Sequence, residues 1–403
     1  MQRRVVITGV GALSAIGVGA AAFSAALRAG RSARAPIRSF DASGFPHDIA
    51  CELKGARPAE FVRKIDPDEW GSASVAAAAA ARLAVDDAGA DPAELRRGRA
   101  GSVMGTTAGE FQLFEGICES WVGEGFPAVR GDQVRHVPAY RLAVAANREL
   151  GLSGEAVTIS TACAASSYAI GYAFDAIRGG DAEYMIAGGA EGGMGRFPLA
   201  GFHRIGAMAK EACSPFDKDR SGILVGEGSS AVFLETLDTA RARGATIYAE
   251  VLGYGLNCDA KHPISPDAGG IAECMRRAHR NAGVKSTEVD YICAHGTGTP
   301  SNDAAEYRAV RDVFGERLPP MSSIKSMIGH TMGAAGCFGA IASALAIKDG
   351  FLPPTINMTC LDPDFAGLDA VPNTAREADL RIVQNNSFAF GGNNAITILG
   401  RVE

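Results

Sequence analysis

Three side chains able to carry covalent and acid–base chemistry lie where an apolar strand is predicted to end. Cys163 follows the run Val157–Ser160, His295 follows Val289–Ala294, and His330 stands at a comparable bend further along the chain. An alanine-rich helix is expected directly after Cys163, and the free N–H groups and positive dipole end of such a helix stabilise a thiolate. The pattern therefore indicates a cysteine nucleophile accompanied by two histidines.

Each of these residues also has a purely structural interpretation. A free cysteine is among the most buried residue types, and a single histidine at a strand end is commonly a hydrogen-bonded core group. Here both histidines have glycine neighbours, in Ala294-His-Gly-Thr-Gly-Thr-Pro300 and at Gly329. Glycines keep space clear beside a side chain, so two histidines in this setting favour the catalytic interpretation.

Other catalytic and binding motifs are absent from the sequence. Gly9-x-Gly11-x-x-Ser14 lacks the third glycine of a dinucleotide fingerprint, so we interpret these glycines as a tight turn between a strand and a helix. No G-x-x-x-x-G-K-[ST] phosphate loop and no G-x-S-x-G elbow occurs. The nine cysteines are scattered without a C-x-x-C pair, which disfavours disulfide frameworks and structural zinc.

The elements that must position these residues alternate between short apolar strands and longer helices. The predicted strands are Val5–Thr8, Gly101–Gly105, Val157–Ser160, Tyr184–Ala187, Ala231–Glu235, Ile247–Gly253, Val289–Ala294, Ile382–Asn386 and Ala395–Leu399. The predicted helices are one from about Gly19 and then Ser72–Ala88, Ala164–Arg178, Ile271–Ala282, Asp303–Phe314 and Ala334–Asp349. This alternation predicts an α/β fold in which helices cover parallel-rich sheets.

The two halves of the chain repeat one pattern. Val157–Cys163 leads into a helix of small residues, and Met321–His330 leads into a similar helix. Each unit is a strand, a reactive side chain at a bend and a small-residue helix, which favours an ancient duplication. We place the boundary near Arg243-Gly244, which gives an N-terminal half of residues 1–244 and a C-terminal half of residues 245–403.

Length and composition are those of a globular protein with a large core. With 403 residues, 47% of them hydrophobic and 21% charged, the chain is expected to bury about 75% of its unfolded surface. The net charge of −6 disfavours nucleic acid and anionic membranes as partners. No apolar stretch reaches the roughly 18 residues of a membrane helix, and glycines interrupt the apolar N-terminal segment, unlike in a signal peptide. We expect a cytoplasmic protein.

Four ordered motifs together resemble one enzyme family. They are Thr161-Ala-Cys163-Ala-Ala-Ser, Ala294-His295-Gly-Thr-Gly-Thr-Pro with Asn302-Asp303, Ser323-Ile-Lys325-Ser-Met-Ile-Gly-His330, and Asn386-Ser-Phe-Ala-Phe390-Gly-Gly. From Arg4 to about Leu399 the chain resembles the elongating β-ketoacyl-[acyl-carrier-protein] synthases of the thiolase superfamily. The resemblance implies a thiolase-like five-layered αβαβα fold of two duplicated halves, and a dimer whose interface borders each active site.

The resemblance also implies a mechanism. Cys163 takes an acyl group from the phosphopantetheine arm of an acyl carrier protein, and this acyl-enzyme divides one condensation into two easier steps. Malonyl-acyl carrier protein then loses CO2, and His295 and His330, as N–H donors, stabilise the enolate. The backbone N–H groups of Cys163 and Phe390 form the oxyanion hole for the acyl carbonyl. Neither a metal ion nor another cofactor is implied.

Supporting residues follow from the same motifs. By resemblance, Lys325 belongs to the catalytic set, either in an orienting role or in proton transfer, with Glu306 as its ion-pair partner. Thr297 and Thr299 match positions that contact the pantetheine arm, although both are also ordinary hydroxyls for a turn.

The gate between the pantetheine tunnel and the acyl pocket is represented by Phe390 and Phe202. The sequence departs from the family beside this gate, since Ala389 stands where glycine is usual and Asn393 where threonine is common. Alanine is strained in a conformation with φ > 0, which puts in doubt that this loop moves as in relatives. Ala108 stands where a bulky aliphatic side chain often closes the acyl pocket, and this favours a type II polyketide pathway over fatty acid elongation.

The implied partners are an acyl carrier protein and, within the dimer, an identical chain or a sister chain-length subunit. Carrier proteins are acidic and this chain is itself net negative, so docking requires a local basic patch. Arg63 and Lys64 resemble a basic pair near the tunnel entrance of the family, and Arg204 is a second candidate.

Three alternatives share this fold. A thiolase needs a second reactive cysteine in the C-terminal half, where this chain has Phe390-Gly-Gly. A starter-unit synthase has Cys, His and Asn, and His330 disfavours it. A non-catalytic chain-length subunit typically lacks the nucleophile, and Cys163 argues against it.

Overall fold

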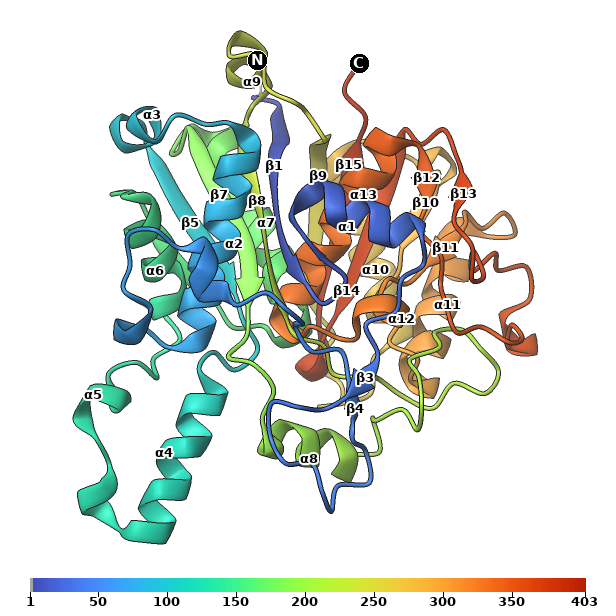
Figure 1. Ribbon diagram of the computed structural model, residues 1–403. Coiled ribbons are helices and arrows are strands. Elements are labelled where there is room, and N and C mark those ends of the chain that lie inside the picture. The colour runs from blue at the N-terminus through green and yellow to red at the C-terminus, as the bar shows by residue number, and fades with distance from the viewer. Residues whose placement is uncertain (1–2) are drawn as a thin grey trace.

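The computed structural model describes residues 3–403, and most of its strands form one mixed sheet built from two five-stranded units (Figure 1). The first unit contains, in spatial order, β6 (Ala156–Ile159), β5 (Ala100–Gly105), β7 (Tyr184–Ala190), β8 (Gly228–Thr236) and β1 (Val5–Ser14). The second contains β11 (Met321–Ser322), β10 (Tyr291–Cys293), β14 (Ile382–Phe388), β15 (Asn393–Gly400) and β9 (Ala249–Cys258).

The two units have the same topology. Numbered along the chain within each unit, the strands of both follow the spatial order 3-2-4-5-1. In both units, the first three strands in this order are parallel to one another. The fourth strand pairs antiparallel with the third and with the fifth. Val5–Ile7 of β1 pairs with Ala249–Val251 of β9 and joins the units at their edges. The strand order therefore repeats, as a duplicated fold requires.

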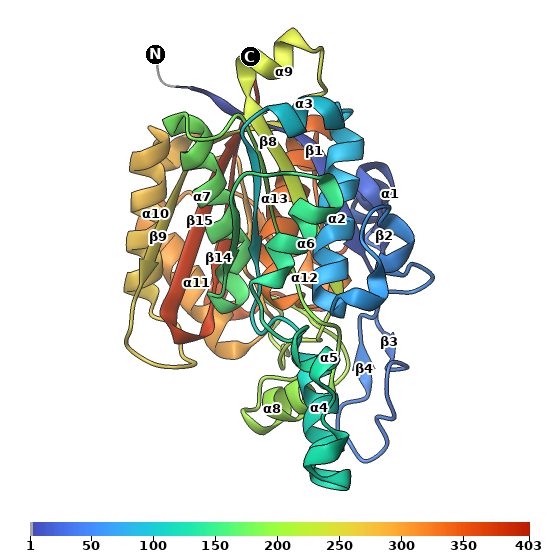
Figure 2. The ribbon, with the colours of Figure 1, turned by 90° about the vertical axis from the view of Figure 1, so that its left-hand side faces the viewer.

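Helices form three layers around these units (Figures 1 and 2). The helices α7 (Ala165–Gly179) and α13 (Ala335–Asp349) contact each other and strands of both units, so they form the central layer. On the outer faces, α2 (Ser72–Ala88) and α6 (Arg141–Leu150) cover the first unit, and α10 (Ala268–Ala282) with α11 (Pro300–Phe314) covers the second. This arrangement confirms the five-layered αβαβα fold expected from the sequence.

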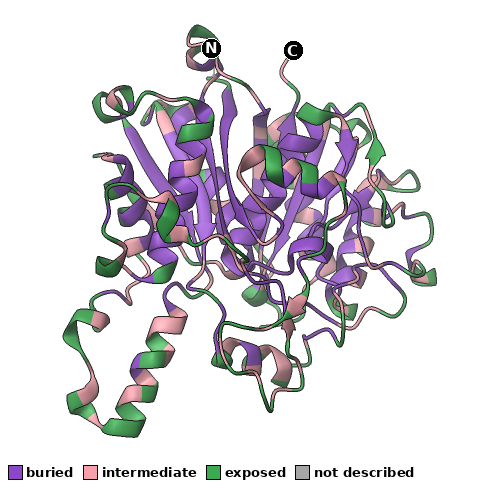
Figure 3. Ribbon diagram, in the orientation of Figure 1, coloured by how far each residue is buried: buried purple, intermediate pink, exposed green. Residues whose placement is uncertain are grey.

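The remaining elements connect these layers or project from them. The helices are α1 (Gly19–Arg28), α3 (Pro92–Arg97), α4 (Phe111–Glu124), α5 (Gly131–Val134), α8 (Arg196–Arg204), α9 (Leu237–Ala242) and α12 (Lys325–Ile328). The short strands are β2 (Gly17–Val18), β3 (Ala35–Pro36), β4 (Ile49–Ala50), β12 (Phe351–Leu352) and β13 (Arg376–Glu377). Figure 3 shows buried residues concentrated in the central strands and helices, while α4 and α5 extend from the body as a largely exposed arm.

The glycines near the N-terminus differ from the sequence prediction. Gly9 and Gly11 lie inside β1, which continues to Ser14, and do not form a turn between a strand and a helix. A Cβ atom at either glycine would lie 2.0 Å from a carbonyl oxygen of Ala84 or Ala80 in α2. The glycines therefore allow the alanine-rich helix to pack directly on the strand backbone.

Most predicted elements occur with their ends shifted by a few residues, but the longer helices α4, α6 and α8 and the short helices α3, α5, α9 and α12 were not predicted. Within residues 3–403, no helix combines the length and the apolar character needed to cross a membrane.

Candidate active site

Cys163 lies in a sharp turn between a strand and a helix. After β6 ends at Ile159, the 3-10 turn η4 (Ala162–Ala164) leads directly into α7. Ala162 has φ = 47°, in the left-handed region that non-glycine residues adopt at a cost. This turn holds Cys163 at the start of α7, where the side chain is buried but borders a cavity.

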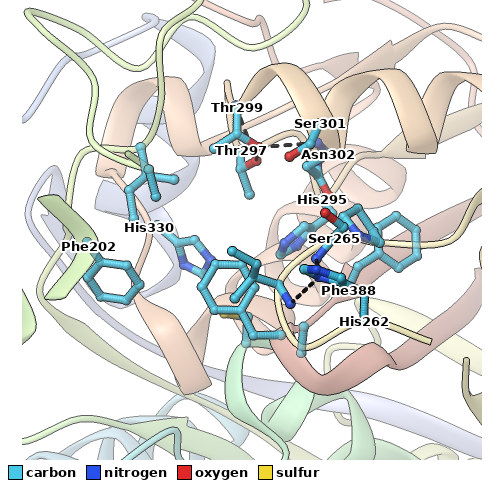
Figure 4. Close-up of a pocket in the computed structure, with 17 residues that line it drawn as sticks. Phe202, His262, Ser265, His295, Thr297, Thr299, Ser301, Asn302, His330 and Phe388 are labelled. Atoms are coloured by element: carbon cyan, nitrogen blue, oxygen red, sulfur yellow. Dashed lines mark hydrogen bonds between the residues drawn. The ribbon is translucent and has the colours of Figure 1, made fainter. Parts of the chain in front are cut away.

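The cavity beside Cys163 has a volume of about 60 Å³ and brings together residues of both halves. Its lining includes the predicted site residues Cys163, His295, His330, Thr297, Thr299, Phe202 and Phe390. Figure 4 shows the two imidazoles between Phe202 on one side and Phe388 on the other. The prediction that the cysteine and the two histidines share one pocket therefore agrees with their positions.

The two histidines are in contact and are held differently. Their ring centroids are 5.5 Å apart, with the planes nearly perpendicular. The backbone N–H of Met332 donates to Nδ1 of His330 (3.0 Å), so the ring proton of His330 resides on Nε2. Nδ1 of His295 is buried without a hydrogen-bond partner, and its ring packs against Phe388.

Both imidazoles are neutral in this environment. Burial lowers the pKa of His295 and of His330 well below the ordinary value, and the positive charge of Lys325 acts in the same direction. A neutral imidazole presents a single N–H donor, which suits it to stabilise a developing negative charge without giving up a proton.

The environment of the thiol corrects one expectation from the sequence. Burial raises the pKa of Cys163 to about 12, although Lys325 and the backbone N–H groups of Cys163 and Phe390 act in the opposite direction. The start of α7 does not therefore stabilise a resting thiolate, because desolvation of the sulfur outweighs it. Cys163 is a neutral thiol before substrate binds, and its proton must leave when an acyl group is transferred.

Lys325 and Glu306 do not form the direct ion pair that the sequence suggested. Within the described residues 3–403, Nζ of Lys325 does not lie within 4.0 Å of a carboxylate oxygen of Glu306. Instead, Nζ of Lys325 donates to the carbonyl oxygen of His295 (2.6 Å), and Glu306 accepts from the N–H groups of His295 (2.9 Å) and Gly296 (2.8 Å). The buried carboxylate uses its oxygens on these backbone groups and on the side-chain amide of Asn386. Both charged residues thus hold the peptide segment that carries His295.

The two threonines lie on the cavity wall, and one of them also has a structural role. Their hydroxyl groups are hydrogen-bonded to each other (2.9 Å). Thr299 caps the N-terminus of α11 by accepting from the backbone N–H of Asn302.

Phe202 and Phe390 separate two cavities. Their ring centroids are 6.5 Å apart, and both residues line the small cavity and a second one of about 560 Å³. The large cavity is mostly apolar, and Ala108 lies on its wall as expected for a residue of the acyl pocket. The aromatic pair therefore lies at the boundary between the cavity beside Cys163 and the large apolar cavity.

The loop beside this gate has ordinary backbone geometry at Ala389. Its φ of −135° is extended, so alanine causes no strain in this conformation, whereas Gly391 has φ = 80°. The N–H of Gly391 donates to the carbonyl oxygen of Pro263 (2.8 Å), and Asn393 begins β15. The gate loop is thereby attached to residues 259–266.

None of the three basic candidates for carrier docking lines either cavity. Arg63 forms an exposed ion pair with Asp86 (2.6 Å), and the backbone N–H groups of Arg63 and Lys64 bind the carboxylate of Glu149. Arg204 is exposed at the end of α8, the helix that carries Phe202.

Sequence reasoning missed several residues of the site. His262, Ser265 and Phe388 line the small cavity, and Glu191 lines the large one. The signal for Phe388 was its place at the end of a predicted strand beside Phe390. Glu191 gave no local signal, because its role depends on two turns that are distant in the sequence. Among residues 3–403, no group of three or more His, Cys, Asp or Glu side chains is placed to hold a metal ion.

Comparisons with known proteins agree with this geometry. Residues 2–240 match the family model described as "Beta-ketoacyl synthase, N-terminal domain", and residues 248–359 match the corresponding C-terminal domain. A 3-oxoacyl-[acyl-carrier-protein] synthase 2 of Coxiella burnetii (strain RSA 493 / Nine Mile phase I) is 38% identical over 100% of this chain and 99% of that protein.

Two solved structures are similar over the full length of both chains. "The ishigamide ketosynthase/chain length factor" has a TM-score of 0.97 and 48% identity, with 100% of each chain covered. A chain of the structure titled "AntDE:AntF (apo): type II PKS acyl-carrier protein in complex with its ketosynthase bound to the hexaketide" has a TM-score of 0.89 and 29% identity, also with 100% of each chain covered.

Proposed function

Because the chain belongs to the β-ketoacyl synthase family, we propose that it catalyses the decarboxylative condensation of an acyl chain on Cys163 with malonyl-acyl carrier protein. The single observation that carries this proposal is the shared cavity of Cys163, His295 and His330. A thiolase reaction is not supported, since Cys163 is the one cysteine lining this cavity within residues 3–403.

In the first step, the sulfur of Cys163 attacks the thioester carbonyl of an acyl carrier protein. The backbone N–H groups of Cys163 and Phe390 lower the pKa of this thiol against the effect of burial, so we assign them to the oxyanion that forms beside the sulfur. The C–S bond to the carrier then breaks. The carrier thiol leaves with the proton lost by Cys163, and the acyl group remains as a thioester on the enzyme.

In the second step, malonyl-acyl carrier protein loses CO2 and its electron pair becomes an enolate. His295 and His330 stabilise the enolate oxygen as N–H donors, and the fixed Nε2 proton of His330 supports this role. The enolate carbon attacks the acyl carbonyl, and the C–S bond to Cys163 breaks. The sulfur takes up one proton, so the products are β-ketoacyl-acyl carrier protein, CO2 and free enzyme.

Lys325 and Glu306 have orienting roles in this proposal. Lys325 binds the carbonyl oxygen of His295 and Glu306 binds the N–H groups of His295 and Gly296, and neither is needed to move a proton along the reaction path. Thr297 and Thr299, at the wall of the small cavity, are suited to contact the pantetheine arm. The proposal requires no bound cofactor, because the phosphopantetheine arm belongs to the carrier substrates.

We further propose that the functional unit is a dimer. Large apolar side chains are exposed along the arm of α4 and α5, namely Phe114, Trp121, Val122, Phe126 and Val134. A patch of this kind marks a protein contact, and the edge strand β6 leaves backbone groups free to pair. Phe111 and Gln112, at the base of the arm, line the large cavity, so a partner here would border the acyl pocket.

The proposed pathway is type II polyketide synthesis, with a sister chain-length subunit as the dimer partner. Ala108 leaves the large cavity open, which suits long acyl chains. The 48% identity to a chain of a structure named "The ishigamide ketosynthase/chain length factor" also supports this choice over fatty acid elongation with an identical partner.

The proposal is tested by intact-mass measurement of the full-length protein mixed with a panel of acyl-loaded carrier proteins. We expect an acyl adduct on one cysteine, with long chains accepted, and a β-ketoacyl carrier product after malonyl carrier is added. A protein that is never acylated by any carrier would be a non-catalytic partner subunit. The molecular size of the protein is measured by itself and after mixing with a chain-length subunit. The two measurements distinguish a dimer of identical chains from a dimer with the sister subunit.

A further inference from the structure

Glu191 occupies a position between two turns that are distant in the sequence. It follows β7 directly, and its side chain lines the large cavity. The carboxylate accepts hydrogen bonds from the hydroxyl of Thr106 (3.0 Å), the backbone N–H of Thr107, the backbone N–H of Ala108 (3.3 Å) and the backbone N–H of Gly333 (2.9 Å). We refer to this carboxylate and its four donors as the Glu191 clamp.

The N–H of Gly333 is the structural counterpart of the N–H of Cys163. The turns η4 and η6 (Met332–Ala334) each precede a helix of 15 residues in the central layer. Their first residues, Ala162 and Met332, have nearly the same left-handed φ, 47° and 49°. In the first half, this N–H belongs to the residue that carries the reactive sulfur, and it lowers the pKa of that thiol. In the second half, the N–H at the same position donates to the side chain of Glu191.

The clamp also reaches His330 through the turn. Met332 and Gly333 are consecutive, and the N–H of Met332 donates to Nδ1 of His330. Fixing Gly333 therefore restricts the peptide that sets the orientation of the imidazole and the position of its proton. Partners of this kind decide where a functional histidine points.

On its other side the clamp holds the wall of the large cavity. Thr107 and Ala108 both line that cavity, and the carboxylate binds the N–H groups of both. The carbonyl oxygen of Thr107 accepts from the hydroxyl of Ser160 (3.2 Å), three residues before Cys163. A single side chain thus connects the chain-binding wall with the turn that carries His330.

We propose that Glu191 is a positioning residue for condensation. It fixes His330 through the Gly333 turn and holds that turn in place relative to the wall of the acyl pocket at Ala108. The inference rests on the proposed function, because it concerns the step that His330 serves. Its alternative is a purely structural brace, whose loss would lower stability and affect both steps of the reaction alike.

The test compares Glu191→Gln with Glu110→Gln in the full-length protein. Glutamine has the shape of glutamate but one acceptor oxygen instead of two, so part of the clamp loses its acceptor. Glu110 serves as the control, since its carboxylate likewise accepts backbone N–H groups, those of Ala73 and Ser74, yet it is buried and lines neither cavity, whereas Glu191 is half-buried. Acylation of Cys163, CO2 release from malonyl carrier protein and thermal unfolding are measured for each variant.

We expect Glu191→Gln to slow CO2 release by about 10- to 100-fold, the scale known for partners that orient a metal-ligating histidine, while acylation changes less than about twofold. Glu110→Gln should leave the ratio of the two rates as in the wild type. Thr106→Val, which removes one donor and keeps the side-chain shape, should shift the ratio in the same direction by a smaller factor. Equal slowing of both steps, or no slowing of either, would overturn the proposal.

Hydrogen exchange separates this inference from the proposed function. In Glu191→Gln, the segment 331–336 should exchange faster than in the wild type, whereas Glu110→Gln should leave that segment unchanged. If the wild type neither acylates nor condenses, the proposed function fails, and exchange still decides whether the clamp holds the turn. Unchanged exchange in Glu191→Gln would contradict the clamp itself.

Discussion

The turns η4 and η6 have similar backbone conformations, but their middle residues have different surroundings. In the first half the turn presents Cys163 to a cavity, and in the second half it presents Gly333 to the carboxylate of Glu191. The arrangement is reciprocal: the end of β14 brings the N–H of Phe390 to the turn of the first half, and the end of β7 brings Glu191 to the turn of the second. A duplicated fold therefore gives two equivalent turns with a backbone N–H at the same position, and the residues that follow the neighbouring strands determine which turn borders a cavity.

Space distinguishes the two turns as clearly as chemistry does. A Cβ atom on Gly333 would lie 2.5 Å from Cα of Thr106 and 2.6 Å from Oε1 of Glu191. The second turn has no room for a nucleophile, whereas Cys163 projects into a cavity. The comparison teaches that catalysis in one half depends on close packing in the other.

The largest effect is expected from removing the side chain of Cys163, the reactive residue at the position that Gly333 occupies in the second turn. Cys163→Ala should abolish acyl-enzyme formation, since no other cysteine within residues 3–403 lines the small cavity. Intact mass after incubation with acyl carrier protein measures this directly. A thioester on another cysteine of this variant would refute the distinction between the two turns.

The histidines are expected to act after acylation. His295→Ala or His330→Ala should leave acylation of Cys163 close to the wild-type rate and lower condensation by about 10²- to 10³-fold, as for loss of one oxyanion donor. Single-turnover acylation and product formation are measured separately. An equal loss of rate in acylation and in condensation would show that the histidines also act in the acylation of Cys163.

Gly333→Ala tests the closed turn. The added methyl group contacts backbone and the carboxylate of Glu191, and overpacking of this kind costs about 1–3 kcal/mol of unfolding free energy. Thermal unfolding should show a clear decrease, while Cys163→Ala, at the equivalent position, should change stability far less. Equal stability of the two variants would mean that the second turn has room for a side chain.

Ala108→Ile should shorten the longest acyl chain accepted. The substitution adds three methyl-sized groups to the cavity wall next to the Glu191 clamp, and each displaces chain contacts worth about 0.8 kcal/mol. Product length and the chain range of acylation are read by mass spectrometry. Unchanged length would indicate that other residues, or the partner subunit, close the pocket.

The smallest effect is expected at the basic residues, all of which belong to the first half. Reversing the charge of Arg63 or Lys64 should raise the apparent KM for carrier protein modestly, because exposed ion pairs contribute about 0.2–1 kcal/mol each. The double reversal should cost more, and added salt should mimic it. If carrier kinetics and their salt dependence stay as in the wild type, docking uses another surface.

Local features of the sequence predicted much of this molecule. Hydrophobic periodicity gave most strands and helices, and Cys163, His295 and His330 stood out because each combines a reactive type with a strand end. Such patterns are local, since side-chain spacing along a strand or helix determines which face is buried. The repeated order of strand, bend and helix indicated a duplication, and the family resemblance of the four motifs implied the five-layered αβαβα fold.

Only the tertiary structure determined the packing, the hydrogen-bond partners and the pKa values of these residues. Gly9 and Gly11 proved to be strand residues because α2 approaches them, and Lys325 and Glu306 bind the His295 backbone where the sequence suggested an ion pair with each other. The raised pKa of Cys163 and the lowered pKa of His330 both follow from burial, which depends on every segment packed around them. Glu191 meets Gly333 across 142 residues of chain, and no local pattern encodes such a contact, because desolvation and long-range hydrogen bonds exist only once distant segments are folded together.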